Sequence, residues 1–412
     1  MPLGRIHMEP LGLVPEFLPF RALRYAAADL APLVAPPYDV LSDADVDALQ
    51  AGSDHNITRV DVPRGDDDRY QRAADLLREW RRDRVLVLDD QPSFTIYRMR
   101  FTDDSGTARD IAGVVGGLEI TDEGAGGVLP HERTTPKAST DRLDLTRATR
   151  TNLSPVWGLS LASGLTALLQ EPGEPVGRVT ENDPWTGSAG PVEHIVERVT
   201  DLGRIADIRK ALDADDVLIA DGHHRYSVSR IYRDDVRAAT GDRTTPAEQT
   251  LAFVHELVAE QLSVDAIHRL YADISPDDLR AALARSFRLS ELGRPAPATL
   301  AAMREEGFLV LVSRDAAWRL DPLPGRFDGV RALDGAWLET ALADVPLTVA
   351  YQHGLAAALA EVDAGRAAAA VLIRPVSLAE IERTGREGLL MPPKSTFFTP
   401  KLKTGLVLRP LD

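Results

Sequence analysis

Apolar and polar positions along the chain follow two different periods. Between residues 67 and 83 apolar residues recur every three or four positions, which predicts an amphipathic helix. Ser42 followed by Asp45 resembles a capping box, so we expect an earlier helix to begin near Asp43. Alternating or short apolar runs predict strands at 85–88, 94–101 and 111–120, and the last two form an antiparallel pair.

The middle of the chain predicts further strands and helices. Several proline and glycine residues between 171 and 190 indicate a surface loop. A helical pattern covers residues 205–212. Strand patterns cover residues 192–199, 217–220, 251–256 and 263–271.

An alanine-rich pattern of helices and strands begins near residue 272. We therefore expect a lead-in segment at 1–19, a first domain at 20–271 and a C-terminal α/β domain at 272–412, from which residues 391–407 can return to the site. The mixture of helices and strands predicts an α+β (mixed α/β) fold.

Composition narrows the classes of protein that the chain can belong to. Hydrophobic residues make up 44% of its 412 residues, which supports well-buried cores. The 63 acidic and 47 basic residues give a net charge of -16, which argues against a general nucleic-acid or anionic membrane surface. The absence of cysteine excludes disulfides, thiolate zinc sites and cysteine nucleophiles.

The apolar stretches are much shorter than the roughly 20 residues of a membrane helix. The first residues carry prolines and acids within their apolar run, unlike a secretory signal. We expect a cytoplasmic protein that binds neither membrane nor nucleic acid.

The most informative stretch is VLIADGHHRYSVSRIY at residues 217–232. An apolar strand ends at Asp221-Gly222, and a helical pattern follows. Helix starts attract anions, and Gly222 lacks the Cβ that would keep a phosphate away from the backbone. The side-chain donors expected at this phosphate are His223, His224 and Arg225. The alternative is an ordinary surface helix with Asp221 as its N-cap.

A second candidate, HERTTPK at residues 131–137, follows a glycine-rich stretch. The functional interpretation makes Glu132 a base or metal ligand and has His131 or Lys137 contact an anion. The alternative is a solvated loop, which uses the same residue types.

Two more segments could present a functional side chain. Prolines and phenylalanines in MPPKSTFFTPKLKTGLV, residues 391–407, can hold Lys394, Ser395, Thr396 and Lys401, and a stiff loop presents a lysine with little ordering cost. A proline-rich tail packed by its phenylalanines explains the same residues. Asp39 follows a rigid Pro-Pro-Tyr turn and is either a catalytic carboxylate or a turn residue. We assign no metal ligands, because adjacent His223 and His224 on a helix point about 100° apart.

Taken together, these blocks resemble a bacterial and archaeal domain-of-unknown-function family, number ten-fifteen. The blocks that carry the resemblance occur in the family's order along nearly the whole chain. They are FRALRY at Phe20, APPYDVLS at Ala35, HERTTPKA at His131, DRLDLTRATRTNLSPVWGL at Asp141, IADGHHRY at Ile219 and MPPKSTFFTPKL at Met391.

The resemblance implies a ParB/sulfiredoxin-like nucleotide-binding core, grouped with free serine kinases. It implies that the phosphate site is formed by Asp221, Gly222, His223, His224 and Arg225. The serine kinases transfer phosphate from a nucleotide to the hydroxyl of free L-serine, with a glutamate base and Mg²⁺. Glu132 and Asp39 are both candidates for that base, and the long C-terminal part, absent from the smaller kinases, allows another substrate.

We therefore expect an enzyme, a small-molecule kinase that uses ATP or ADP with Mg²⁺ and favours L-serine. Lys137 and Lys394 would neutralise charge on the transferred phosphoryl group. The main alternative is a ParB-like regulator that binds or hydrolyses a nucleotide without kinase activity. A structural protein with charged polar loops is a third possibility.

Overall fold

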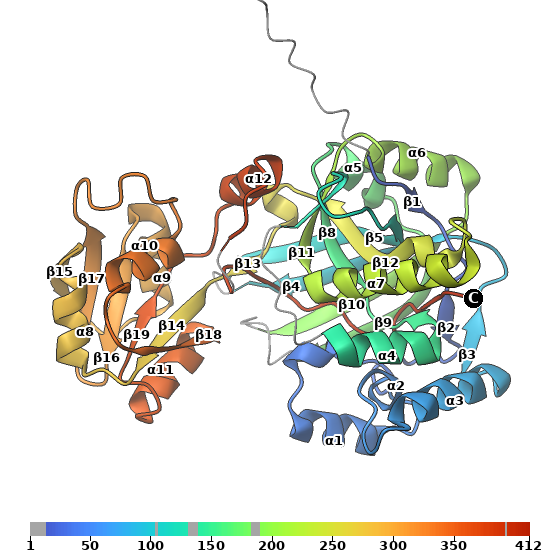
Figure 1. Cartoon of the computed structure of the whole chain (residues 1–412), viewed down its shortest axis with the longest axis horizontal. Coiled ribbons are helices and arrows are strands. Elements are labelled where there is room, and N and C mark those ends of the chain that lie inside the picture. Colours follow the sequence, from blue (N-terminus) through green and yellow to red (C-terminus); the bar gives the residue numbers. More distant parts are fainter. Residues whose placement is uncertain (1–13, 104–105, 131–138, 183–189, 392–393) are drawn as a thin grey trace, which may run out of the picture.

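The computed structural model describes residues 14–103, 106–130, 139–182, 190–391 and 394–412. Within them the chain builds two large sheets, each in a region of its own, and the regions lie side by side along the long axis (Figure 1). Helices and strands mix in both regions, which confirms the predicted α+β class. Among the described helices, none combines the length and apolar character needed to span a bilayer.

The first region contains, in its described part, a nine-stranded sheet in the order β6-β11-β8-β12-β5-β4-β10-β9, with β1 pairing to β5. Strand β11 is parallel to β6 and β12 is parallel to β8, whereas the other neighbours are antiparallel. The strands are β1 Phe17–Leu18, β4 Phe94–Thr102, β5 Ala108–Glu119, β6 Val128–Leu129, β8 Val156–Ser160, β9 Glu174–Asn182, β10 Pro191–Val199, β11 Val217–Asp221 and β12 Gln249–Glu256.

Helices cover both faces of this sheet. On one face α5 (Leu165–Gln170) and α6 (Leu202–Leu212) bury leucine and isoleucine side chains against the strands. On the other face α3 (Arg69–Arg82) buries Trp80 and Leu77, which gives its apolar stripe a core to fill. The remaining elements of this region are β2 Leu23–Tyr25, η1 Tyr38–Val40, α1 Asp43–Gly52, α2 Thr58–Asp61, β3 Leu86–Leu88, α4 Ser139–Thr149, β7 Thr151–Asn152, α7 His223–Thr240, η3 Pro246–Glu248, η4 Ala259–Gln261 and β13 Val264–Asp265.

The second region, residues 267–372, holds an antiparallel sheet in the order β15-β17-β16-β19-β14-β18. Helices α8 and α10 pack on one face, and α9 and α11 pack on the other. The elements are β14 Ile267–Ala272, α8 Pro276–Leu283, β15 Phe287–Leu292, α9 Pro297–Glu306, β16 Leu309–Ser313, β17 Ala317–Pro322, α10 Asp334–Leu342, β18 Thr348–His353, α11 Leu355–Asp363 and β19 Ala369–Leu372.

After α12 (Leu378–Arg386) the chain returns to the first region. We call residues 394–412 the C-terminal strap. Its β20 (Phe397–Phe398) pairs with β13, and its β21 (Arg409–Pro410) pairs with β7. Backbone hydrogen bonds in both directions join Ala35 and Thr404, at 3.2 and 2.8 Å. The second region is therefore inserted between two segments of the first.

Most predicted elements occur close to their expected residues, including the capping box of Ser42 and Asp45 at the start of α1. The predicted loop at 171–190 is wrong in its described part, because β9 runs through it and pairs with β10. Its proline and glycine residues are tolerated because β9 is the edge strand of the sheet. Strand β14 already belongs to the second sheet, so the change of region precedes the expected boundary at 272.

Candidate functional site

The turn between β11 and α7 has the backbone geometry that an anion site requires. Strand β11 is buried up to Ala220, and Gly222 then takes a left-handed conformation with φ of 87°. A Cβ at Gly222 would lie 3.0 Å from the guanidinium carbon of Arg225. Gly222 gives no side-chain cap to α7, so the positive end of an 18-residue helix is not neutralised by its own N-cap residue.

At this turn the carboxylate of Asp221 contacts two cations. Its Oδ2 atom lies 3.2 Å from Nη2 of Arg225 and 3.5 Å from Nζ of Lys401. Burial would raise the pKa of Asp221, but the charges of Lys401 and Arg225 outweigh it and hold that pKa far below its usual range. An ionised Asp221 repels phosphate, so its part in the site is to hold the two cations in place.

Arg225 is 9% exposed and has two fixed contacts. One amino group donates to the carbonyl oxygen of Pro155 and the other contacts Asp221. Burial alone would lower the pKa of Arg225, but the carboxylates of Asp221 and Asp39 raise it, so the guanidinium stays charged. The predicted bidentate grip on phosphate therefore competes with contacts that Arg225 already makes.

Lys401, which the sequence analysis names in segment 391–407 without giving it a role, is the lysine that the structure brings to Asp221. Its side chain is 8% exposed, and Nζ lies 4.2 Å from the centre of the Phe397 ring. Phe397 also stacks on His353 of the second region, with ring centres 4.3 Å apart. The sequence places several lysines in this segment, and no spacing rule tells which one turns toward Asp221.

Lys394, the lysine predicted from this segment, is exposed and has a left-handed backbone with φ of 60°. Its carbonyl oxygen accepts a hydrogen bond of 3.3 Å from Arg269. The described contacts do not bring Lys394 to Asp221, and its predicted role stays a prediction.

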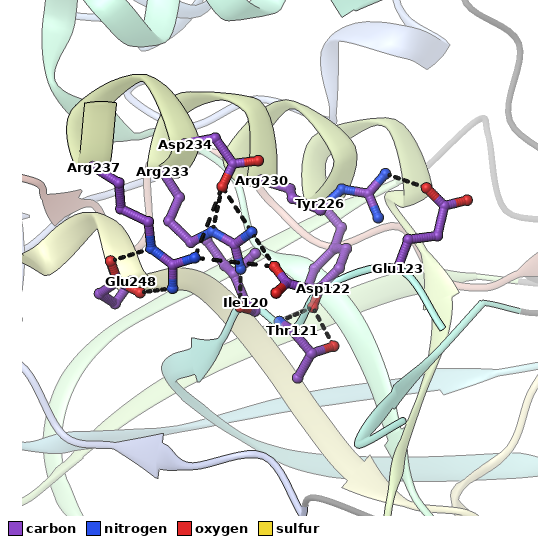
Figure 2. Close-up of polar contacts among 10 residues, drawn as sticks. All are labelled: Ile120, Thr121, Asp122, Glu123, Tyr226, Arg230, Arg233, Asp234, Arg237 and Glu248. Carbon is purple, nitrogen blue, oxygen red and sulfur yellow. Dashed lines mark hydrogen bonds and ion pairs between the residues drawn. The ribbon is translucent and has the colours of Figure 1, made fainter. Parts of the chain in front are cut away.

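A cavity of about 330 Å³ opens beside the start of α7. One wall is the α7 face that carries His223, Ser227 and Arg230, and the facing wall is the segment after β5. Figure 2 shows two contacts between these walls: Arg230 with Glu123, at 3.1 Å, and the Tyr226 hydroxyl with Thr121. The remaining lining residues are Asp122, Gly124, Val128, Pro130, Ile219 and Leu390.

Asp39 lies in the turn η1 and is exposed. Its charge acts on Arg225, so the structure brings this predicted carboxylate near the start of α7. The neighbouring Tyr38 ring lies 4.2 Å from the Arg142 guanidinium carbon. Tyr38, Arg142 and Arg225 line a small cavity of about 40 Å³ with Asp61, whose pKa is raised by burial.

His131, Glu132 and Lys137 lie outside the described residues. The described flanks approach β11 and α7 from both sides. Before the segment, β6 pairs with β11, and after it α4 contacts α7.

No cluster of three or more His, Asp or Glu side chains suited to a metal ion occurs in the described part of the chain. The described residues therefore do not fit a preformed Mg²⁺ site, and the predicted ion stays a prediction. Mg²⁺ commonly takes most of its ligands from water and substrate phosphates.

A family model described as a protein of unknown function (DUF1015) matches residues 17–336. The chain belongs to this family. The match confirms the DUF1015 resemblance predicted from the sequence blocks, whereas the wider ParB/sulfiredoxin likeness stays a prediction. None of the curated proteins compared with this DUF1015 chain matches it.

Three solved structures are similar to this DUF1015 chain. A conserved hypothetical protein from Pyrococcus furiosus is 12% identical, with a TM-score of 0.34 over 68% of this chain and 92% of its own. A free serine kinase in complex with AMP is 10% identical, with a TM-score of 0.34 over 68% and 88%. A truncated SbnI from Staphylococcus aureus is 12% identical, with a TM-score of 0.36 over 72% and 87%. At these values the likeness carries no argument about the site.

Proposed function

We propose that this protein is a nucleotide-dependent phosphotransferase acting on the hydroxyl of a small molecule, with free L-serine as the favoured acceptor and ATP or ADP as donor. The observation that carries the proposal is the pair of cations, Arg225 and Lys401, that share Asp221 at the start of α7. Among the described residues, Asp221 is the carboxylate that both cations contact directly, whereas Asp39 acts on Arg225 without an ion pair and is exposed. The helix start at Gly222 itself favours anions.

The cavity of about 330 Å³, which His223 lines and Arg225 and Lys401 do not, is the place proposed for the rest of the donor. His223 connects the proposed phosphate position with the cavity, because it is the first residue of α7 and also lines the cavity. In the proposed arrangement the phosphates lie over Gly222, His223 and His224, and the nucleoside extends along the α7 face toward Arg230.

In the transfer step the acceptor oxygen forms a bond to phosphorus while the bond from phosphorus to the bridging oxygen of the nucleotide breaks. The acceptor proton passes to a carboxylate, Glu132 or Asp39, and the shortened nucleotide leaves with the electron pair. Lys401 and Lys137 stabilise charge on the transferred oxygens, and positioning supplies much of the rate.

Calorimetry with ATP, ADP and CTP, each with and without L-serine, tests the proposal together with a mass-spectrometric assay for phosphoserine. The kinase interpretation predicts nucleotide binding and a phosphorylated hydroxyl product. Nucleotide binding or hydrolysis that is indifferent to hydroxylated small molecules favours the ParB-like regulator. Absence of nucleotide binding rejects both.

The substitution Lys401→Met tests the named cation. We expect turnover and nucleotide affinity to fall by about tenfold or more, because an oriented charge at the phosphoryl group is usually worth at least that. Lys210→Met removes an exposed lysine from α6 and is the matched control. Equal activity of the two variants would remove Lys401 from the site.

A further inference from the structure

A cavity of about 420 Å³ lies where the chain crosses between the two regions. Residues 262–265, which lead into the second region, and residues 374–377, which lead out of it, both line this cavity. Its size falls within the range of small-molecule sites. The proposed phosphotransfer uses none of its lining residues.

Most charges on its walls are already paired. Arg109 contacts Asp103 at 2.7 Å, and Arg374 contacts both carboxylate oxygens of Asp334. Glu380 likewise pairs with an arginine, Arg331 of the neighbouring loop. These pairs offer little net charge to a ligand. Asp265, which is 8% exposed, also lines the cavity and has a contact of its own.

Arg304, on α9, is the exception. Arg304 is exposed and lines the cavity, and no carboxylate of the described chain lies within ion-pair distance of it. Beside it the wall is apolar: Leu333 is 6% exposed, and Leu262 and Val376 pack partly against the same core. A guanidinium next to an apolar surface matches a molecule with one carboxylate and a short aliphatic body.

The cavity also adjoins the strand that holds the C-terminal strap. Ser263 shares a 3.0 Å hydrogen bond between its hydroxyl and that of Thr399, and Asp265 of the wall pairs with Phe397. Phe397 in turn lies under Lys401. An occupant would therefore rest against the strand that fixes the position of Lys401.

We propose that this cavity is an effector site for a small aliphatic monocarboxylate. Its carboxylate is held by Arg304 and its aliphatic body by Leu262, Leu333 and Val376. Only its effect on Lys401 rests on the proposed function, whereas binding itself does not.

Hexanoate is a suitable probe, with 1-hexanol and acetate as analogues that lack the charge or the long aliphatic body. Calorimetry and thermal unfolding of the full chain should show binding of hexanoate and much weaker binding of either analogue. Arg304→Ala should weaken hexanoate binding by about tenfold, because it removes the charged partner. Arg288→Ala, an exposed arginine of β15 outside the cavity, should bind hexanoate as the wild type does.

No binding of hexanoate at millimolar concentration, or equal binding by the Arg304→Ala variant, would overturn the proposal. So would binding of 1-hexanol as tight as that of hexanoate. Nucleotide affinity measured without hexanoate should be the same in Arg304→Ala and wild type. A protein that binds hexanoate but no nucleotide would refute the phosphotransferase and leave this site standing.

Discussion

In the second half of α7 each arginine forms ion pairs with neighbouring carboxylates. Arg233 and Arg237 contact the carboxylates of Asp122, Asp234 and Glu248, so two cations meet three anions (Figure 2). Arg233 is also 2% exposed and donates to the carbonyl oxygen of Ile120. Every cation in this half has an anion of its own, and the cluster stabilises the position of the helix.

At the start of the same helix, within the described chain, the cations outnumber the carboxylates that contact them. There Arg225 and Lys401 both contact the carboxylate of Asp221, and the exposed Asp39 acts on Arg225 from a greater distance. The residue types match those of the second half, but here two cations contact the same carboxylate; of this turn, His223 lines the cavity of about 330 Å³ and neither cation does. An arginine therefore marks a candidate anion site only where the carboxylates around it do not already pair every cation, as they do around Arg233 and Arg237.

The sharpest way to break the comparison is a pair of alanine substitutions. Arg225→Ala should lower the free energy of unfolding by about 2–4 kcal/mol, because it strips a buried carbonyl and carboxylate of their donor. It should also reduce nucleotide affinity and turnover by about tenfold or more. Arg233→Ala should destabilise the fold by about 1–3 kcal/mol and leave nucleotide affinity unchanged. Urea unfolding and calorimetry measure both; a loss of binding in Arg233→Ala alone would reverse the assignment.

The two ends of α7 allow a second matched test. Gly222 and Gly241 flank the helix with φ values of 87° and 70°, so alanine is strained at both, at a cost of about 1–3 kcal/mol. Only at Gly222 would the new Cβ also press on Arg225; at Gly241 it meets nothing within 4 Å. Thermal unfolding should shift in both variants, and nucleotide binding should fall only in Gly222→Ala. Equal binding by both variants would show that Arg225 and Gly222 do not act together.

Acid sensitivity should come from buried histidines rather than from the Asp221 pairs. Burial lowers the pKa of His255, on β12, to about 4, so the folded state stays neutral while the unfolded chain gains a proton below about pH 6.5. From pH 7 to about pH 5 this group should cost about 2 kcal/mol of stability. The pKa of Asp221 is lowered, so its contribution is lost only below about pH 4. Urea unfolding of His255→Gln across this range should show a smaller loss on acidification; an unchanged slope would assign the acid sensitivity elsewhere.

We expect the smallest effect in the second half of α7, where every arginine is already paired with a carboxylate. Glu248→Gln weakens the ion pair with Arg237. The side chains of Glu248 and Arg237 are 17% and 22% exposed, so the substitution should lower the free energy of unfolding by about 0.5–1 kcal/mol. Nucleotide binding should not change. Added salt should shrink the difference between the two proteins, since partly exposed pairs are screened. A measurable fall in nucleotide affinity would extend the site along the helix.

The elements that the sequence predicted well are those with a strong local signal. The helix at α3 has an apolar stripe, and the strand before Asp221 is a run of four apolar residues. Strand β9 was missed because Pro175 and Gly177 are turn residues in most contexts, and its place at the sheet edge depends on pairing with distant β10. Local pattern could not supply that pairing.

The candidate site likewise has features that the sequence predicts and features that depend on the folded structure. The left-handed Gly222 at a strand-to-helix joint was predictable from adjacent residues, and the structure has it. The position of Lys401 was not predictable, because it depends on Phe397, on His353 of the second region and on the path of the C-terminal strap. Arg225 was expected to reach for phosphate, whereas its contacts with Pro155 and Asp221 arise from the folded neighbourhood.

The pairing of Lys401 with Asp221 joins positions 180 residues apart. On a translating ribosome the amino-terminal sheet and the whole inserted region emerge before that lysine does. The start of α7 therefore gains its second cation only once the C-terminal strap has docked on the first region, however early the sheet itself folds.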